Sequence, residues 1–100
     1  MGVTNNENHW QLMVLMLKDI AEQKNKTHQD IADDTGLHRS NVTRFFGLKY
    51  CPNLNTFLLV SRSLQVNFFF ESQDSETDIN RSFEKAMEQL ERRLDKLSKN

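Results

Sequence analysis

One stretch of the chain, residues 27 to 46 (THQDIADDTGLHRSNVTRFF), constrains the fold more than any other. Thr27 followed three residues later by Asp30 predicts a capping box at the start of a helix, in which each side chain accepts a backbone N–H of the other residue. Gly36 marks the end of that helix, since helices commonly end on a residue with positive φ. The stretch therefore predicts two short helices separated by a glycine turn.

The second of these helices, expected near residues 39 to 46, has two unlike faces. Val42 and Phe45 would face the core, and Leu37 would re-enter it just before the helix. The opposite face would present hydrogen-bond donors, which reading base edges in a DNA major groove requires. These donors are on Arg39, Ser40, Asn41, Thr43 and Arg44. A solvated helix face without a ligand is the plain alternative.

Composition limits the fold to a small helical domain with an appendage. The chain has 100 residues, of which 37% are hydrophobic, so it can bury one modest core. Three glycines and one proline leave little room for the turns of an all-β fold. We therefore expect an all-α fold.

The side chains that support chemistry are too scattered for an enzyme. The single Cys51 excludes an internal disulfide and, with histidines only at 9, 28 and 38, leaves no zinc-binding spacing. Nothing resembles a nucleophile with its base, so no catalytic activity, metal, cofactor or small-molecule ligand is expected. The longest apolar run, Leu12 to Leu17, is too short to cross a membrane, and no signal segment is evident. A cytoplasmic location is expected.

The formal net charge of −1 conceals a segregation of sign along the chain. Residues 24 to 62 carry six cations against three acids, whereas residues 71 to 100 carry eight acids against six cations. Because salt screens charges over roughly 10 Å, distant acids weaken the attraction of the basic segment for phosphates only slightly. The segment with the two short helices is therefore suited to a nucleic acid.

The N-terminal part is expected to form an arm, residues 1 to 8, and a helix from about His9 to Lys24. Leu12, Leu15 and Met16 lie off the main apolar stripe of this helix, so a second apolar face must be buried under the C-terminal segment or against another subunit. The main stripe comprises Trp10, Met13, Val14, Leu17, Ile20 and Ala21.

Pro52 separates the two short helices from a further helix, since no helix interior accepts it. Asn53 or Asn55 would cap that helix, which is expected to run to about Leu64. Its inward residues are predicted to be Leu54, Phe57, Leu58 and Leu64, with Ser61, Arg62 and Ser63 nearer solvent. Residues 66 to 70 are expected to form a short extended segment, with Phe68 and Phe70 as core plugs in the alternative.

The C-terminal part is predicted to be an acidic linker, residues 71 to 78, followed by an amphipathic helix, residues 79 to 99. Asn80 at a coiled-coil a position of this helix would suit a parallel dimer or cap the helix. Fewer than three heptads are too short for an isolated coil, so the helix must pack on another subunit or fold back on its own domain. Its apolar seam, the expected dimerisation surface, comprises Phe83, Met87, Leu90, Leu94 and Leu97.

From about Leu17 to Phe68, about half of the chain, the sequence resembles the lambda-repressor-like helix-turn-helix family, of the Cro/repressor or xenobiotic-response-element type. The resemblance implies a bundle of four or five helices, residues 9 to 70, with the helix near 39 to 46 in the major groove. It also implies a dimer on two half-sites about one DNA turn, roughly 34 Å, apart. A helical hairpin without DNA function is the alternative. The resemblance runs without gaps through Ile31-Ala32, Gly36-Leu37, Val42, Pro52, Leu54, Phe57, Leu64 and Val66.

Carried onto this sequence, the resemblance places base reading at the five donor residues of the second short helix, foremost Arg39, Ser40 and Arg44. Arginine most often binds guanine bidentately, so a half-site that contains guanine is expected. The candidates for holding the DNA backbone are Thr27, His28, Gln29, Lys49, Tyr50 and Asn53.

Three features depart from the family's pattern. The glutamine that commonly opens the first short helix is His28 here. An arginine and a glutamate that pair in many members are Ala21 and Phe46 here, so we predict that Phe46 packs over Ala21. Lys26 stands where an apolar residue is usual, and its ammonium is expected to point at solvent or DNA.

Two functions follow as hypotheses. The first is a sequence-specific double-stranded DNA-binding transcriptional regulator that forms a homodimer through its C-terminal helix. The second is an antitoxin-like or phage-regulatory adaptor, whose C-terminal helix binds a different protein and whose DNA binding serves autoregulation.

Overall fold

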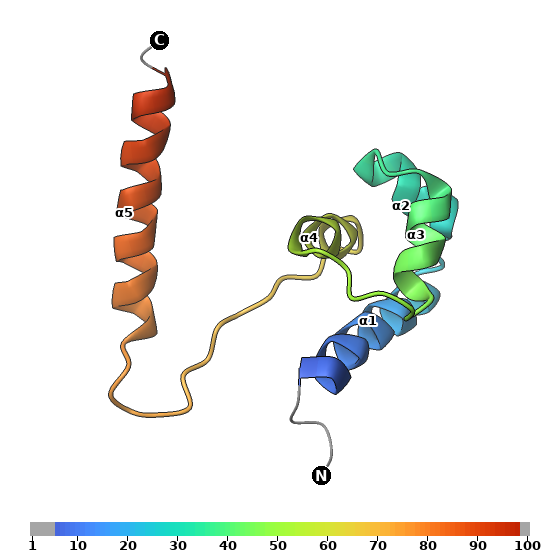
Figure 1. Ribbon diagram of the computed structural model, residues 1–100, viewed down its shortest axis with the longest axis horizontal. Helices are drawn as coiled ribbons and strands as arrows, with labels where there is room; N and C mark the ends of the chain where they lie inside the picture. Colours follow the sequence, from blue (N-terminus) through green and yellow to red (C-terminus); the bar gives the residue numbers. More distant parts are fainter. Residues whose placement is uncertain (1–5, 99–100) are drawn as a thin grey trace. The chain divides into compact units, whose positions relative to one another are not determined.

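The protein is all-helical over the part that the structure describes. A computed structural model describes the backbone of residues 6–98 and the side chains of residues 9–96. Within that range it has no strand, which confirms the expected all-α class. The helices are α1 Asn6–Gln23, α2 His28–Thr35, α3 Arg39–Phe46, α4 Leu54–Ser63 and α5 Ile79–Ser98 (Figure 1).

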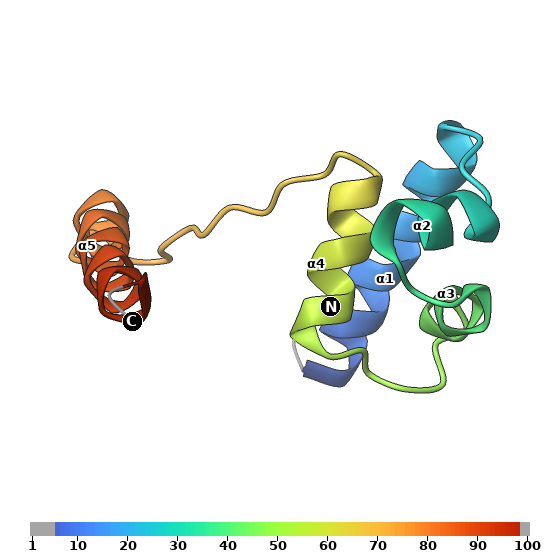
Figure 2. The same cartoon turned by 90° about the horizontal axis from the view of Figure 1, so that it is seen from above.

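The chain divides into two units, the first ending at Asn67 and the second beginning at Phe68. The first unit contains α1 to α4, which lie grouped together in Figure 2. In this unit α2 contacts α3 and α4, and α1 contacts α3. The division falls after Asn67, whereas the sequence placed it after Phe70. Residues 6 to 8, expected in the N-terminal arm, belong to α1, and the rest of that arm lies outside the described residues.

One apolar core holds the first unit together. Val14, Leu17 and Ala21 of α1 are buried in it, as their spacing predicted. The off-stripe residues Leu12, Leu15 and Met16 of α1 are exposed, so a second apolar face of this helix is uncovered in the single chain. The other buried apolar residues are Ile31, Ala32, Val42, Phe45, Phe46, Phe57, Val60 and Leu64, with Trp10, Met13, Ile20, Leu37, Leu48 and Val66 packed against them.

Local hydrogen bonds set the ends of the short helices. The Thr27 hydroxyl accepts the Asp30 N–H at 3.0 Å, and the Asp30 carboxylate accepts the Thr27 N–H at 2.9 Å, which confirms the capping box. This bond from the Thr27 backbone holds the pKa of Asp30 below its ordinary value. Gly36 ends α2 with φ of 80°, in the left-handed region. Asn53, rather than Asn55, caps α4 by accepting the Thr56 N–H at 2.8 Å.

The inward face of α4 differs from the predicted one. Phe57 and Leu64 are buried as expected, together with Val60 and Ser61. Ser61 was wrongly expected near solvent; it is only 2% exposed, and its hydroxyl donates to the Phe57 carbonyl at 2.7 Å. That bond removes the cost of burying the hydroxyl.

Leu54 and Leu58 were wrongly predicted to face inward. They are 71% and 46% exposed, respectively. Both lie beside the face of α4 that Phe57, Val60 and Ser61 present to the core, since Leu54 precedes Phe57 and Leu58 precedes Ser61 by three residues. The apolar surface of this helix is wider than the part that the core covers, and the packing of α2 against α4 decides which part is buried.

A polar tie joins Lys26, just before α2, and Asp34, in the last turn of α2, to Ser63 at the end of α4. The Lys26 ammonium donates to the Asp34 carboxylate and, at 3.5 Å, lies within reach of the Ser63 hydroxyl. Ser63 in turn donates to Asp34 at 2.8 Å. The bonds from Lys26 and Ser63 hold the pKa of Asp34 below its ordinary value. The Lys26 ammonium is thus engaged within the protein, contrary to the expectation that it points at solvent or DNA.

The segment from Phe68 to Asp78 has neither helix nor strand. Phe69 and Phe70 are each 90% exposed and Phe68 is 43% exposed, so the core-plug alternative is wrong. Asp78 caps α5 by accepting the Arg81 N–H at 3.0 Å, which leaves the neighbouring Asn80 inside the helix rather than at its cap.

Candidate nucleic-acid interface

Helix α3 combines a buried apolar face with an exposed polar one. Val42, Phe45 and Phe46 are buried and anchor it to the core, and Leu37 before it is partly buried. Three buried side chains on a helix of 8 residues leave little freedom for it to rotate. The five residues predicted to read bases are exposed on the outer side: Arg39, Ser40, Asn41, Thr43 and Arg44.

The turn before α3 is held by local hydrogen bonds of its backbone N–H groups. The Gly36 N–H donates to the Ala32 carbonyl at 2.9 Å, and the Leu37 N–H donates to the Thr35 hydroxyl at 3.2 Å. His38 precedes α3 in an extended conformation and makes no side-chain cap. The angle between α2 and α3 is therefore set by the positive φ of Gly36 and by the apolar contacts behind it.

His28 links the two short helices on their outer side. Its Nδ1 lies 2.9 Å from the Thr43 hydroxyl, and its ring stacks on Phe46 with centroids 5.3 Å apart. Phe46 also meets Phe45 edge to face, with centroids 4.9 Å apart. Of the predicted contact residues, His28 and Thr43 are thus brought together, each already bonded to the other. The sequence placed His28 near DNA but did not indicate its stacking on Phe46, which depends on how the helices cross.

Phe46 is buried, in keeping with the prediction that it packs over Ala21. It is 6% exposed and lies in the same core cluster as Ala21, which is also 6% exposed. Helices α1 and α3, which carry the two residues, are in contact. Apolar contact therefore joins α3 to α1 where many members of the resembled family have an ion pair.

A surface pocket gathers four predicted contact residues from three segments. Asn41 and Arg44 from α3, Tyr50 from the loop and Asn53 from the cap of α4 line it together with Leu37, Phe45, Pro52 and Thr56. The Arg44 guanidinium carbon lies 6.0 Å from the centroid of the Tyr50 ring, within cation–π range. Tyr50 is 64% exposed, so one of its edges remains accessible. Thr56 is a member of this group that the sequence did not indicate.

The remaining backbone candidates lie in the loop after α3 and at the start of α2. Lys49 is exposed in the loop after α3, where Leu48 has φ of 62°. Gln29 is exposed on α2 and donates to the Asp33 carboxylate at 2.9 Å. The hydroxyl of Thr27 and the amide oxygen of Asn53 both serve helix caps, so only their remaining hydrogen-bond capacity is open to a ligand.

The charges near α3 favour an anionic partner. Arg39 and Arg44 on α3 and Lys49 just after it are exposed cations, and α3 has no acid in its first turn. The three acids of α2 each accept a hydrogen bond, Asp30 from Thr27, Asp33 from Gln29 and Asp34 from Lys26, and only Asp34 has a cation as its partner. Helix α3 itself carries two arginines and no acid. The exposed polar face of α3 is therefore positive.

The apolar seam predicted on α5 is exposed in the single chain. Phe83, Met87, Leu90 and Leu94 are 65%, 40%, 48% and 53% exposed, respectively. The side chain of Leu97 lies outside the described ones. Removing this much apolar surface from water would be favourable, so the seam is a candidate protein-binding surface.

A metal site and a membrane span are both absent from the described residues. They contain no group of three or more His, Cys, Asp or Glu side chains placed to hold a metal ion. None of the described helices is long and apolar enough to span a bilayer. Comparisons of the chain with protein-family models, with curated proteins and with solved structures found no match.

Proposed function

We propose that this protein is a sequence-specific double-stranded DNA-binding transcriptional regulator of the lambda-repressor-like helix-turn-helix type. The observation that carries the proposal is the two-sided character of α3. Its Val42, Phe45 and Phe46 are buried, while its donors point outward in a positively charged setting. The capped α2 and the left-handed Gly36 hold that helix at a defined angle. A helix of about 10 Å diameter fits the major groove of B-DNA.

In this proposal the front of α3 reads the bases. Arg39 and Arg44 each bind a guanine bidentately through O6 and N7, an interaction that contributes about 1–3 kcal/mol of discrimination. Ser40 and Asn41 reach neighbouring base edges. Thr43 is held by His28 and acts at the phosphates or at a base edge next to them.

The backbone contacts flank this reading helix. Lys49 and Tyr50 follow α3, and Thr27, His28, Gln29 and Asn53 lie at the starts of α2 and α4. Hydroxyl, amide and ammonium groups of this kind fix the register of a protein on DNA without reading sequence. The protein acts as a homodimer joined through α5, so that two copies of α3 reach two half-sites.

An adaptor function is the second candidate, and the exposed seam of α5 favours it. The exposed Phe83 and Leu94 would equally fit an apolar groove on a different protein. The protein would then be antitoxin-like or phage-regulatory, with DNA binding serving its own regulation. A measured mass distinguishes the two, because the first function requires a homodimer.

The DNA-reading assignment is tested by selecting binding sites from random duplexes with the full chain. We expect a recovered motif that contains guanine, and about a 5- to 150-fold loss of affinity for each half-site on Arg39→Ala substitution. Arg62→Ala is the matched control, because Arg62 is an exposed arginine on α4 outside the reading face. Recovery of no motif, or an equal affinity of the Arg39→Ala variant for the motif, would contradict the assignment.

A further inference from the structure

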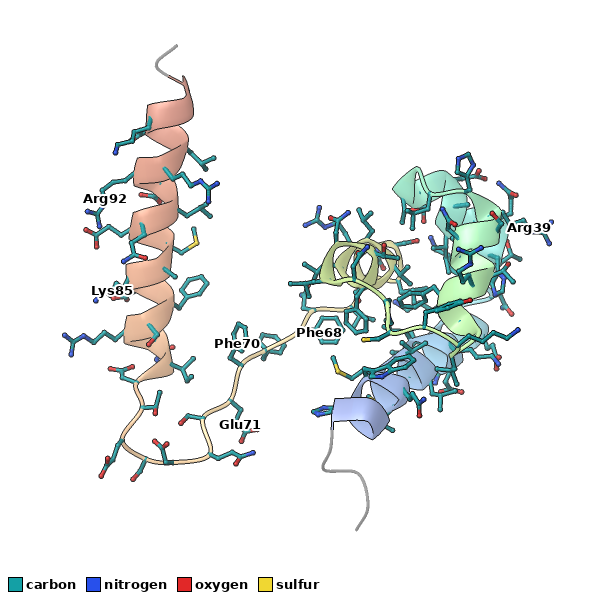
Figure 3. All side chains as sticks on the ribbon, viewed as in Figure 1. Arg39, Phe68, Phe70, Glu71, Lys85 and Arg92 are labelled. Carbon is teal, nitrogen blue, oxygen red and sulfur yellow. The ribbon has the colours of Figure 1, made fainter. Side chains whose placement is uncertain are left out.

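The seam of α5 has the register of a two-stranded coiled coil. In heptad notation, in which positions a and d face the partner, Asn80, Met87 and Leu94 occupy a, whereas Phe83, Leu90 and Leu97 occupy d. Lys85 and Arg92, at the f position, project from one side of the helix (Figure 3). The helix thus has one apolar face and one charged face along its whole length.

We propose that α5 pairs with α5 of a second copy of this chain as a parallel, in-register coiled coil, which tethers two DNA-binding units without clamping them at one separation. The part that concerns DNA rests on the function proposed above. The part that concerns orientation rests on three observations from α5 and from the segment before it.

The first observation is the charge at the positions that flank the seam. Glu84 and Glu91 occupy e, whereas Ile79, Ala86 and Arg93 occupy g. In a parallel pair, e faces g of the partner, so Glu84 lies beside Ile79 and Glu91 beside Ala86, and no like charges meet. In an antiparallel pair with full overlap, e faces e, so Glu84 of each copy meets Glu91 of the other. Repulsion between like charges therefore disfavours the antiparallel arrangement.

The second observation is Asn80. It lies inside α5, and the helix cap is made by Asp78 instead. In a parallel pair the two Asn80 side chains meet at the first a layer, where their amides can bond each other and fix the register. In the antiparallel pair each Asn80 would lie against Leu97, which offers its amide no hydrogen bond.

The third observation is the segment that joins the two units. Residues 68 to 78 have no helix or strand and separate Asn67 from the first residue of α5. A segment of eleven residues extends at most about 36–40 Å. Two such segments, one from each copy, that start at the same end of a parallel coil can therefore span more than the roughly 34 Å between adjacent half-sites. In a parallel coil both segments join the coil at the same end, and in this proposal that end faces the DNA.

Disulfide trapping in the full chain tests the orientation. All variants carry Cys51→Ser, which removes the exposed native thiol. Asn80→Cys leaves the apolar seam intact and should form a cross-linked dimer under mild oxidation, because the parallel pair brings the two positions together. Lys85→Cys is the matched control on the charged face and should cross-link poorly at equal concentration.

The antiparallel arrangement has its own reporter. Phe83 and Leu94 face each other only in that arrangement, and in the parallel one they are about 16 Å apart along the coil. A mixture of Phe83→Cys and Leu94→Cys chains should therefore give mostly like-with-like products. A dominant mixed product would overturn the proposal, as would a monomeric wild-type chain across a concentration series in sedimentation equilibrium.

The tether is tested with duplexes that carry two copies of the selected half-site. Inserting five base pairs, about half a turn, should lower the affinity by less than about threefold, because effective concentration changes slowly with span. A loss as large as that caused by deleting one half-site would show a rigid clamp and overturn this part. A chain that cross-links in parallel but selects no DNA would refute the proposed function alone. A dimer that selects a motif but gives mainly the mixed product of Phe83→Cys and Leu94→Cys would refute this inference alone.

Discussion

At the scale of single residues, Gly36 and His28 do most to fix the orientation of α3. Gly36 adopts a φ that other residues avoid, and His28 is held between Thr43 and Phe46. The backbone angle of Gly36 and the contacts of His28 both limit the orientation of α3 relative to α2. Changes at these positions should therefore affect the reading face as well as the stability of the first unit.

Gly36→Ala should destabilise the first unit by about 1–2 kcal/mol, the cost of a left-handed β-carbon. A β-carbon at Gly36 would have nothing within 4 Å, so the cost comes from the backbone and not from a clash. Gly36→Asn is the comparison, because asparagine tolerates positive φ better. Urea unfolding followed by circular dichroism measures both, and equal midpoints for wild type and Gly36→Ala would contradict this account.

At the scale of the elements, the first unit is held by apolar contact between helices and by one polar tie. Phe46 gives α3 its contact with the core that includes Ala21, without the ion pair of the resembled family. Asp34, in the last turn of α2, bonds both to Lys26 just before that helix and to Ser63 at the end of α4. The apolar contacts are insensitive to pH, whereas the tie depends on the charge of Asp34.

The tie predicts a specific dependence of stability on pH. The pKa of Asp34 is lower in the folded protein than its ordinary value of 3.8, because Lys26 and Ser63 donate to the carboxylate. Its contribution to stability is therefore fully present above the unfolded pKa and is lost as pH falls through the folded pKa. Asp34→Asn should lower the unfolding midpoint at neutral pH, and the difference from wild type should shrink on acidification.

A second substitution separates the tie from other effects of Asp34. Lys26→Met should cost stability in the wild-type background but less in Asp34→Asn, since the partner is then already gone. Thermal unfolding of the four chains at neutral and acidic pH completes this comparison. Additive effects at neutral pH would show that the two side chains do not act on each other.

At the scale of the whole molecule, the division into two units separates reading from association. The core residues of the first unit lie between Trp10 and Val66, so none of them belongs to the linker or to α5. The large apolar side chains described in the second unit are exposed, except for Ile79, which is half-buried. Association through α5 should then be separable from the folding of α1 to α4.

A chain that ends after Gln73 should keep its cooperative unfolding and its midpoint, because it retains the entire core cluster. It should be a monomer and should bind a single half-site as well as wild type does. It should lose the gain from a second half-site, about 10²–10⁴-fold for a linked pair. Light scattering and binding to one-site and two-site duplexes measure this, with the full-length Leu90→Asp variant as the matched control for loss of the seam. A truncated chain that still dimerises would contradict the separation.

Much of the first unit follows from the sequence by itself. The capping box at Thr27, the turn at Gly36 and the ends of α2 and α3 depend on φ preferences and on hydrogen bonds between residues close in the chain. The buried stripe of α1 follows from helical spacing. The apolar seam of α5 was recognised for the same reason, and its exposure in the single chain leaves its partner to experiment.

Other features were decided only by tertiary structure. Ser61 is buried and Leu54 and Leu58 are exposed, because the contact of α4 with α2 decides which part of the helix surface the core covers. The bond of Lys26 to Asp34 and the stacking of His28 on Phe46 join residues 8 and 18 positions apart. Short-range preferences are carried by each residue and its neighbours, whereas these contacts exist only once the helices have crossed at particular angles. For that reason the sequence indicated the donors of α3, but only the fold placed Arg44, Tyr50 and Asn53 around one pocket.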